Sequence, residues 1–187
     1  EDPHDINSLP IEWPVGIKNI GYLTVYDNYN NYKTAIGRYL SFQGNPVNWS
    51  VGLIALLLSL CLITARMVFD IRILNTKTFN YILIFTSLYI GYMISVTIIA
   101  IQRVLYINTY FLPLFFSFIL FFLIFNYIFE EYIVKKDKII YISLLLLVFQ
   151  IFYVYYYASP ITYAQSVTYL ECEKTKIVDF WEDLCDR

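Results

Sequence analysis

The chain has 187 residues, of which 59% are hydrophobic and 15% charged, and its mean hydropathy is +0.57. A composition this apolar excludes a water-soluble globular domain, and only six Gly and six Pro exclude collagen-like and linker-like chains. The net charge of −2 comes without a stripe of Lys and Arg, so we expect no nucleic-acid partner. What remains is a multi-span membrane protein.

One His and three Cys, with no Cys-x-x-Cys pair, supply too few ligands for a zinc or iron–sulfur site. We therefore expect no metal. We also expect no cofactor.

Residues 1–48 are polar and contain four prolines, and they lack the charged, apolar and small-residue order of a signal peptide. Neither an initiator Met nor a translocation signal precedes them. We expect an ordered loop outside the membrane, in a chain that is the final part of a longer polypeptide.

Four apolar stretches are long enough to cross a bilayer, because about 30 Å of hydrocarbon needs roughly 20 helical residues. They are residues 49–69, 79–101, 110–129 and 139–157. The predicted fold is an all-α membrane protein with four transmembrane helices in the module 49–158, followed by an acidic tail, residues 159–187.

The distribution of Lys and Arg predicts the orientation of these spans. Three basic residues lie at or after the end of the first span and three follow the third, whereas the connection between the second and third spans has only Arg103. The six are Arg66, Arg72, Lys77, Lys135, Lys136 and Lys138. The two basic loops are expected to be cytosolic, which places residues 1–48 and the tail in the lumen of the endoplasmic reticulum, or in the periplasm of a bacterium.

Two cysteines lie thirteen positions apart in the tail, Cys172 and Cys185. On an oxidising side of the membrane they could close a disulfide, and two free thiols fit the sequence equally well.

Two short non-cytosolic patterns are more specific than the hydropathy. Residues 8–14 read Ser-Leu-Pro-Ile-Glu-Trp-Pro, and residues 44–49, at the mouth of the first span, read Gly-Asn-Pro-Val-Asn-Trp. Residues 103–113 begin with Arg103, are rich in Tyr and end in Pro. Together these segments resemble the C-terminal four-span module of the protein O-mannosyltransferases, enzymes of the C-type glycosyltransferase superfamily.

The resemblance implies an enzyme that transfers mannose from dolichyl phosphate mannose to Ser or Thr of secretory proteins, in the endoplasmic reticulum membrane. It implies as partners membrane lipid, the polyprenyl-phosphate sugar donor, an acceptor polypeptide and a homologous subunit. The family's catalytic acid pair belongs to the N-terminal half, so no catalytic residue is expected in this chain, which alone would be inactive. The alternative is a non-catalytic four-span adaptor or assembly subunit.

Arg103 is the sharpest single candidate. A guanidinium at the end of an apolar span needs an anionic partner, and its geometry suits a phosphate of the lipid-linked donor. The alternative is an interfacial Arg that reaches lipid headgroups or pairs with a carboxylate of a loop. Further candidates for a donor or acceptor cleft are Asn45, Trp49, Tyr106 and Tyr110, although such aromatic rings also form the belts found at membrane interfaces.

Overall fold

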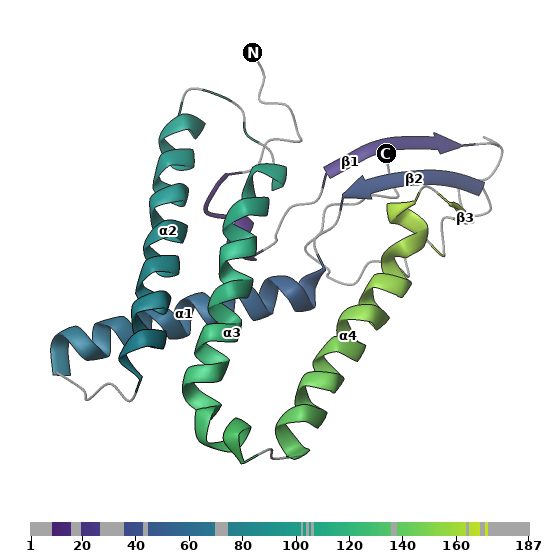
Figure 1. Ribbon diagram of the computed structural model, residues 1–187. Coiled ribbons are helices and arrows are strands. Elements are labelled where there is room, and N and C mark those ends of the chain that lie inside the picture. The colour runs from purple at the N-terminus through teal and green to yellow at the C-terminus, as the bar shows by residue number, and fades with distance from the viewer. Residues whose placement is uncertain are drawn as a thin grey trace.

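Four long helices dominate the structure, a computed structural model that describes residues 9–15, 20–26, 36–42, 45–69, 75–101, 103, 105, 107–135, 138–163, 165–168 and 171 (Figure 1). They are α1 (Pro46–Phe69), α2 (Thr76–Ala100), α3 (Phe111–Val134) and α4 (Lys138–Thr162). Two 3-10 helices, η1 (Trp13–Val15) and η2 (Ile107–Tyr110), and three strands complete the described elements. Each long helix carries an apolar stretch that could span a bilayer, which confirms the predicted four-span membrane fold.

An asparagine sets the start of each of the first two helices. The Oδ1 of Asn45 accepts a hydrogen bond of 3.0 Å from the backbone N–H of Val47, and Pro46 occupies the first helical position, where a missing N–H costs nothing. Asn75 caps α2 in the same way, by accepting 3.1 Å from the N–H of Thr78. Because of these caps, both helices begin three residues before the apolar stretches from which they were predicted.

The central helix is α3, because it packs against both α1 and α2. Gly52, Ala55 and Ser59 are buried on α1, at a spacing that places them on one side of the helix. A Cβ atom built at Gly52 would lie 2.4 Å from Oγ of Ser117 on α3, so only a glycine allows this approach of the two backbones. The core of α3 continues through the buried Leu120.

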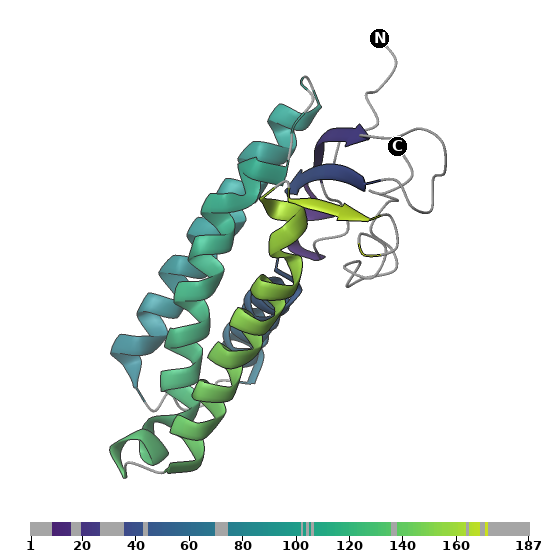
Figure 2. The same ribbon diagram turned by 90° about the vertical axis from the view of Figure 1, so that its right-hand side faces the viewer.

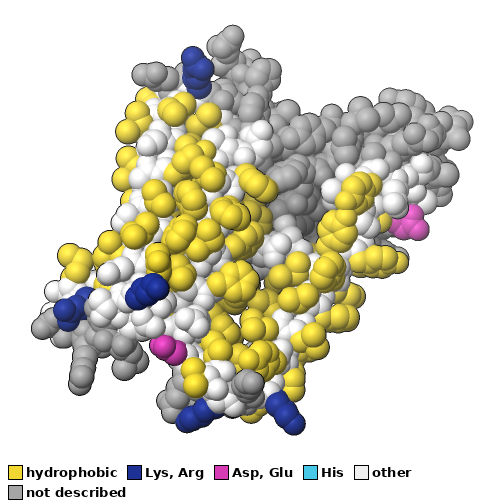
Figure 3. All heavy atoms as spheres, in the orientation of Figure 1, with side chains coloured by type: hydrophobic (Ala, Val, Ile, Leu, Met, Phe, Trp, Pro, Cys, Tyr) yellow, Lys and Arg dark blue, Asp and Glu magenta, His cyan; other side chains and the backbone are white. Residues whose placement is uncertain are grey.

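Helix α4 stands apart from these three. Its main neighbours among the described elements are the strand β2 (Ile36–Phe42) and α1, and large side chains such as Leu145 and Tyr156 are 70% and 79% exposed. Hydrophobic side chains cover the visible faces of α2, α3 and α4 in Figure 3, as expected of surfaces that meet lipid. A hydrogen bond of 3.1 Å from Nδ2 of Asn45 to the carbonyl of Ile151 ties α4 to the start of α1.

The last turns of α4 continue past a proline. Pro160 has no N–H to donate to the carbonyl of Tyr156, and the hydroxyl of Ser159 donates to that carbonyl at 2.8 Å instead. The helix therefore reaches Thr162, five residues beyond the end of the apolar stretch predicted to span the membrane.

A three-stranded antiparallel sheet lies beside the end of α4 in both views (Figures 1 and 2). The strand β1 (Ile20–Tyr26) pairs with β2 in a register that runs from Ile20 opposite Phe42 to Tyr26 opposite Gly37. The strand β3 (Ser166–Thr168), just after α4, pairs with the other edge of β2. The prediction of an ordered loop before the first span was therefore incomplete, because this segment contributes two strands.

Candidate functional site

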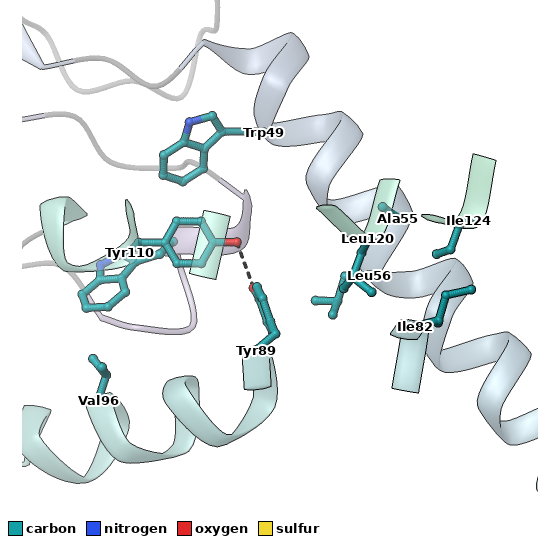
Figure 4. Close-up of a cluster of buried hydrophobic side chains, with 10 residues drawn as sticks. Trp49, Ala55, Leu56, Ile82, Tyr89, Val96, Tyr110, Leu120 and Ile124 are labelled. Atoms are coloured by element: carbon teal, nitrogen blue, oxygen red, sulfur yellow. Dashed lines mark hydrogen bonds between the residues drawn. The ribbon is translucent and has the colours of Figure 1, made fainter. Parts of the chain in front are cut away.

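The side chain of Tyr110 is the hub of a buried aromatic cluster where α2 ends and α1 and α3 begin (Figure 4). Its ring centroid lies 5.1 Å from that of Trp49, 6.3 Å from that of Trp13 and 6.3 Å from that of Tyr89. These four rings come from η1, α1, α2 and η2, and all are at most 7% exposed. The cluster therefore joins four elements that are distant in sequence.

Two tyrosine hydroxyls attach η2 to α2. The hydroxyls of Tyr89 and Tyr110 form a buried hydrogen bond of 2.8 Å, and the hydroxyl of Tyr92 donates to the carbonyl of Thr109 at 3.2 Å. Tyr89 and Tyr92 are three residues apart, so both face η2 from neighbouring turns of α2. The second half of the connection between α2 and α3 is thereby held against the side of α2.

Arg103 begins the same connection. Its backbone N–H donates to the carbonyl of Ile99 at 3.0 Å, which fixes its main chain to the last turn of α2. Its side chain is exposed, and within the described part of the chain its guanidinium makes no ion pair. A cation is stabilised at the carboxyl end of a helix, where carbonyl groups lack partners. The arrangement presents a permanent positive charge that can bind an anion such as a phosphate.

The structure gives a packing role to three predicted cleft residues. Trp49 and Tyr110 are 7% and 3% exposed within the aromatic cluster, so neither ring offers a free face to a ligand. Asn45 uses its oxygen to cap α1 and its nitrogen to bind α4. Their contact with donor or acceptor stays a prediction.

The other sequence candidates lie outside the described residues, namely Tyr106 and the cysteines Cys172 and Cys185. The described ranges contain no group of three or more His, Cys, Asp or Glu side chains that could hold a metal ion.

Sequence reasoning missed Tyr89 and Tyr92 because both lie inside an apolar span, where an aromatic residue gives no signal of its own. Their spacing was the available clue, since polar tips on successive turns of one helix indicate a shared partner.

The comparisons with known proteins point to one family. A family model described as the C-terminal four TMM region of protein-O-mannosyltransferase matches residues 1–181. Comparison with curated proteins finds no match. Among solved structures, the chain is similar to a chain of the S. cerevisiae protein O-mannosyltransferase Pmt1-Pmt2 complex bound to the sugar donor, with a TM-score of 0.70 and 19% sequence identity.

That structural alignment covers 99% of this chain and 25% of the yeast chain, so the chain spans about a quarter of the length of this relative. At 19% identity the likeness shows the fold alone. The family match is the stronger result, because it extends over nearly the whole sequence. The chain thus belongs to the protein O-mannosyltransferase family, as a representative of its C-terminal four-transmembrane region.

Proposed function

We propose that this chain forms the C-terminal membrane module of a protein O-mannosyltransferase, and that the whole enzyme transfers mannose from dolichyl phosphate mannose to Ser or Thr of secretory proteins. The family match over residues 1–181 carries the proposal. The related yeast structure is a Pmt1-Pmt2 complex bound to the sugar donor, which supports a sugar donor and a partner subunit. The match also favours this enzyme module over the non-catalytic adaptor.

In such a transfer, a hydroxyl of the acceptor attacks the anomeric carbon of mannose while the bond from that carbon to the phosphate oxygen breaks. The hydroxyl proton goes to a general base, which we place in the part of the enzyme outside this chain. The departing dolichyl phosphate gains negative charge, and a cation beside it lowers the barrier. We assign this role to Arg103, whose side chain is exposed and whose main chain is bound to the last turn of α2.

The proposal includes a location. The helix ends around Arg103 would face the lumen of the endoplasmic reticulum, where secretory polypeptides arrive, and the two basic connections would face the cytosol. The coloured Lys and Arg side chains in Figure 3 support this orientation, because most of these described residues lie at the end of the helices opposite to the end of α2.

The test measures mannosyl transfer from radiolabelled dolichyl phosphate mannose to a Ser/Thr peptide, in membranes that contain the full-length protein. Arg103→Ala should lower kcat/KM for the donor about 10- to 100-fold, the effect of losing one charge-assisted contact that strengthens in the transition state. Lys77→Ala is the matched control, since it removes an exposed cation at the start of α2. We expect it to keep full activity.

Two results would count against the proposal in different ways. Full activity of Arg103→Ala, with unchanged thermal unfolding, would remove Arg103 from the site. No transfer by the wild-type protein to any Ser/Thr peptide, in membranes where the donor is intact, would overturn the assignment of the activity.

A further inference from the structure

The N-terminal segment reaches the connection between α2 and α3 through the large side chain of Trp13. Trp13 is 0% exposed and contacts the ring of Tyr110, the hub of the aromatic cluster. The segment around it is a compact turn, in which the N–H of Leu9 donates to the carboxylate of Glu12 and the N–H of Glu12 donates back to the carbonyl of Leu9, both at 2.9 Å. The backbone that leads into Trp13 is therefore fixed by local hydrogen bonds.

The connection that carries Arg103 is fixed at two points. At its start, the N–H of Arg103 is bound to the carbonyl of Ile99. At its end, η2 is bound to α2 through Thr109 and Tyr110. Only residues 104–108 separate these points, so a shift of η2 can be passed along this short connection to Arg103.

The burial of Trp13 decides what its removal would do. A fully buried indole leaves a large cavity when it is truncated, and neighbouring groups move to fill such a space. The ring of Tyr110 is one of the neighbours of Trp13, and its hydroxyl is also the group that holds η2 against Tyr89.

We infer that Trp13 is a positioning residue for Arg103: packed against Tyr110, it keeps η2 seated on α2 and so sets where the guanidinium stands. This inference rests on the proposed function, in which Arg103 meets the donor phosphate. A residue some ninety positions earlier in the chain would thus control phosphate binding without touching the substrate.

A double-mutant cycle in the full-length protein tests this inference, with kcat/KM for dolichyl phosphate mannose as the measurement. Trp13→Ala alone should lower this value roughly fivefold or more, whereas in the Arg103→Ala background it should change the value by less than about twofold. Trp13→Phe should recover most of the loss. Val15→Ala, on the exposed side of the same 3-10 turn, is the control and should keep wild-type values.

Independent effects of the two substitutions would overturn the inference, because a purely structural loss lowers activity whether or not Arg103 is present. If Arg103→Ala is fully active, a loss in Trp13→Ala would also overturn it, since Trp13 would then act through something else. Trp13→Leu keeps a large apolar side chain without the aromatic ring. If Trp13→Ala does not fold, Trp13→Leu replaces it in the double-mutant cycle.

Hydrogen exchange gives a readout that does not depend on catalysis. In Trp13→Ala, the amides of η2 should exchange faster than in the wild type, while those in the middle of α2 and α3 keep their protection. Val15→Ala should leave η2 unchanged. Equal protection of η2 in the wild type and in Trp13→Ala would show that Trp13 does not hold this connection.

Discussion

At the scale of single residues, Asn45 joins two helices with one short side chain. Its oxygen caps α1, and its nitrogen donates to the carbonyl of Ile151 in α4. A cap can be predicted from Asn followed by Pro, because both residue types favour the first positions of a helix. The bond to α4 cannot, because its partner lies 106 residues away and is a backbone atom.

Gly52 gives a prediction at this scale. Gly52→Ala should lower the free energy of unfolding by about 1–3 kcal/mol, because the new methyl group would overlap the hydroxyl of Ser117. That hydroxyl donates to the carbonyl of Leu114 at 2.7 Å and cannot turn away without losing the bond. Thermal unfolding of the purified protein in detergent measures the effect.

Gly91 provides the matched control. A Cβ built there meets nothing within 4 Å, and the residue is exposed on α2. Gly91→Ala should leave the free energy of unfolding unchanged or raise it by up to about 1 kcal/mol, because Ala has a higher helix propensity than Gly. Equal unfolding temperatures for the two alanine variants would contradict the close packing of α1 on α3.

At the scale of elements, Asn75 links the start of α2 to the end of α3. Its Oδ1 caps α2, and its Nδ2 donates to the carboxylate of Glu130 at 3.2 Å. Asn75→Asp should keep the cap but place two carboxylates together, so we expect a lower unfolding temperature. Asn75→Asp combined with Glu130→Gln should recover it, because an amide can donate to the new aspartate. A double variant no more stable than Asn75→Asp would sink this pairing.

The helices were the most predictable elements, because hydropathy alone marks a stretch that crosses a bilayer. The residues at which the helices end were less predictable. The apolar stretch predicted for the third span ends at Phe129, and α3 continues to Val134 through a non-helical residue at that same position, with φ −106° and ψ 16°. A polar continuation of this kind lies outside the hydrocarbon, so hydropathy has no information about it.

The hairpin was missed for a different reason. Residues 20–26 and 36–42 are rich in Ile, Tyr, Val and Leu, and the stretch between them contains Asn and Asp, which together favour strands and a turn. In a chain this apolar, such short runs have little contrast with their surroundings. The pairing of β2 with β3 is harder still to predict, because β3 has only three residues and lies beyond all four spans.

The sequence drew attention to some residues of the candidate site, and their binding roles stay predictions. Arg103 stood out because a charge beside an apolar span is costly, and it is exposed at the end of α2 as a ligand-binding charge must be. Trp49 and Tyr110 were correctly placed at the helix ends, but sequence cannot tell a ring that faces a cleft from one that packs on other rings. That distinction depends on Trp13, which lies in the N-terminal segment, distant in sequence from Tyr110.

At the scale of the whole molecule, the proposed orientation gives a prediction about sidedness. In a background where Cys61, Cys172 and Cys185 are replaced by Ser, Lys77→Cys should react with a membrane-impermeant maleimide in sealed microsomes. Asn108→Cys should react only after the membrane is permeabilised. Both positions are exposed, so a difference in reaction reports the side of the membrane. Labelling of Asn108→Cys in sealed microsomes would reverse the orientation.

The sheet has a consequence for how the protein is made. β2 comes before the first span and β3 after the fourth, yet the two strands are hydrogen-bonded neighbours. A ribosome must therefore translate past Thr168 before β2 can complete its second edge, and by then all four helices have been synthesised. Among the described strands, β1 is the partner of β2 that is synthesised before the spans, and β3 becomes available only after α4. The three-stranded sheet can therefore be completed only after all four spans have been synthesised.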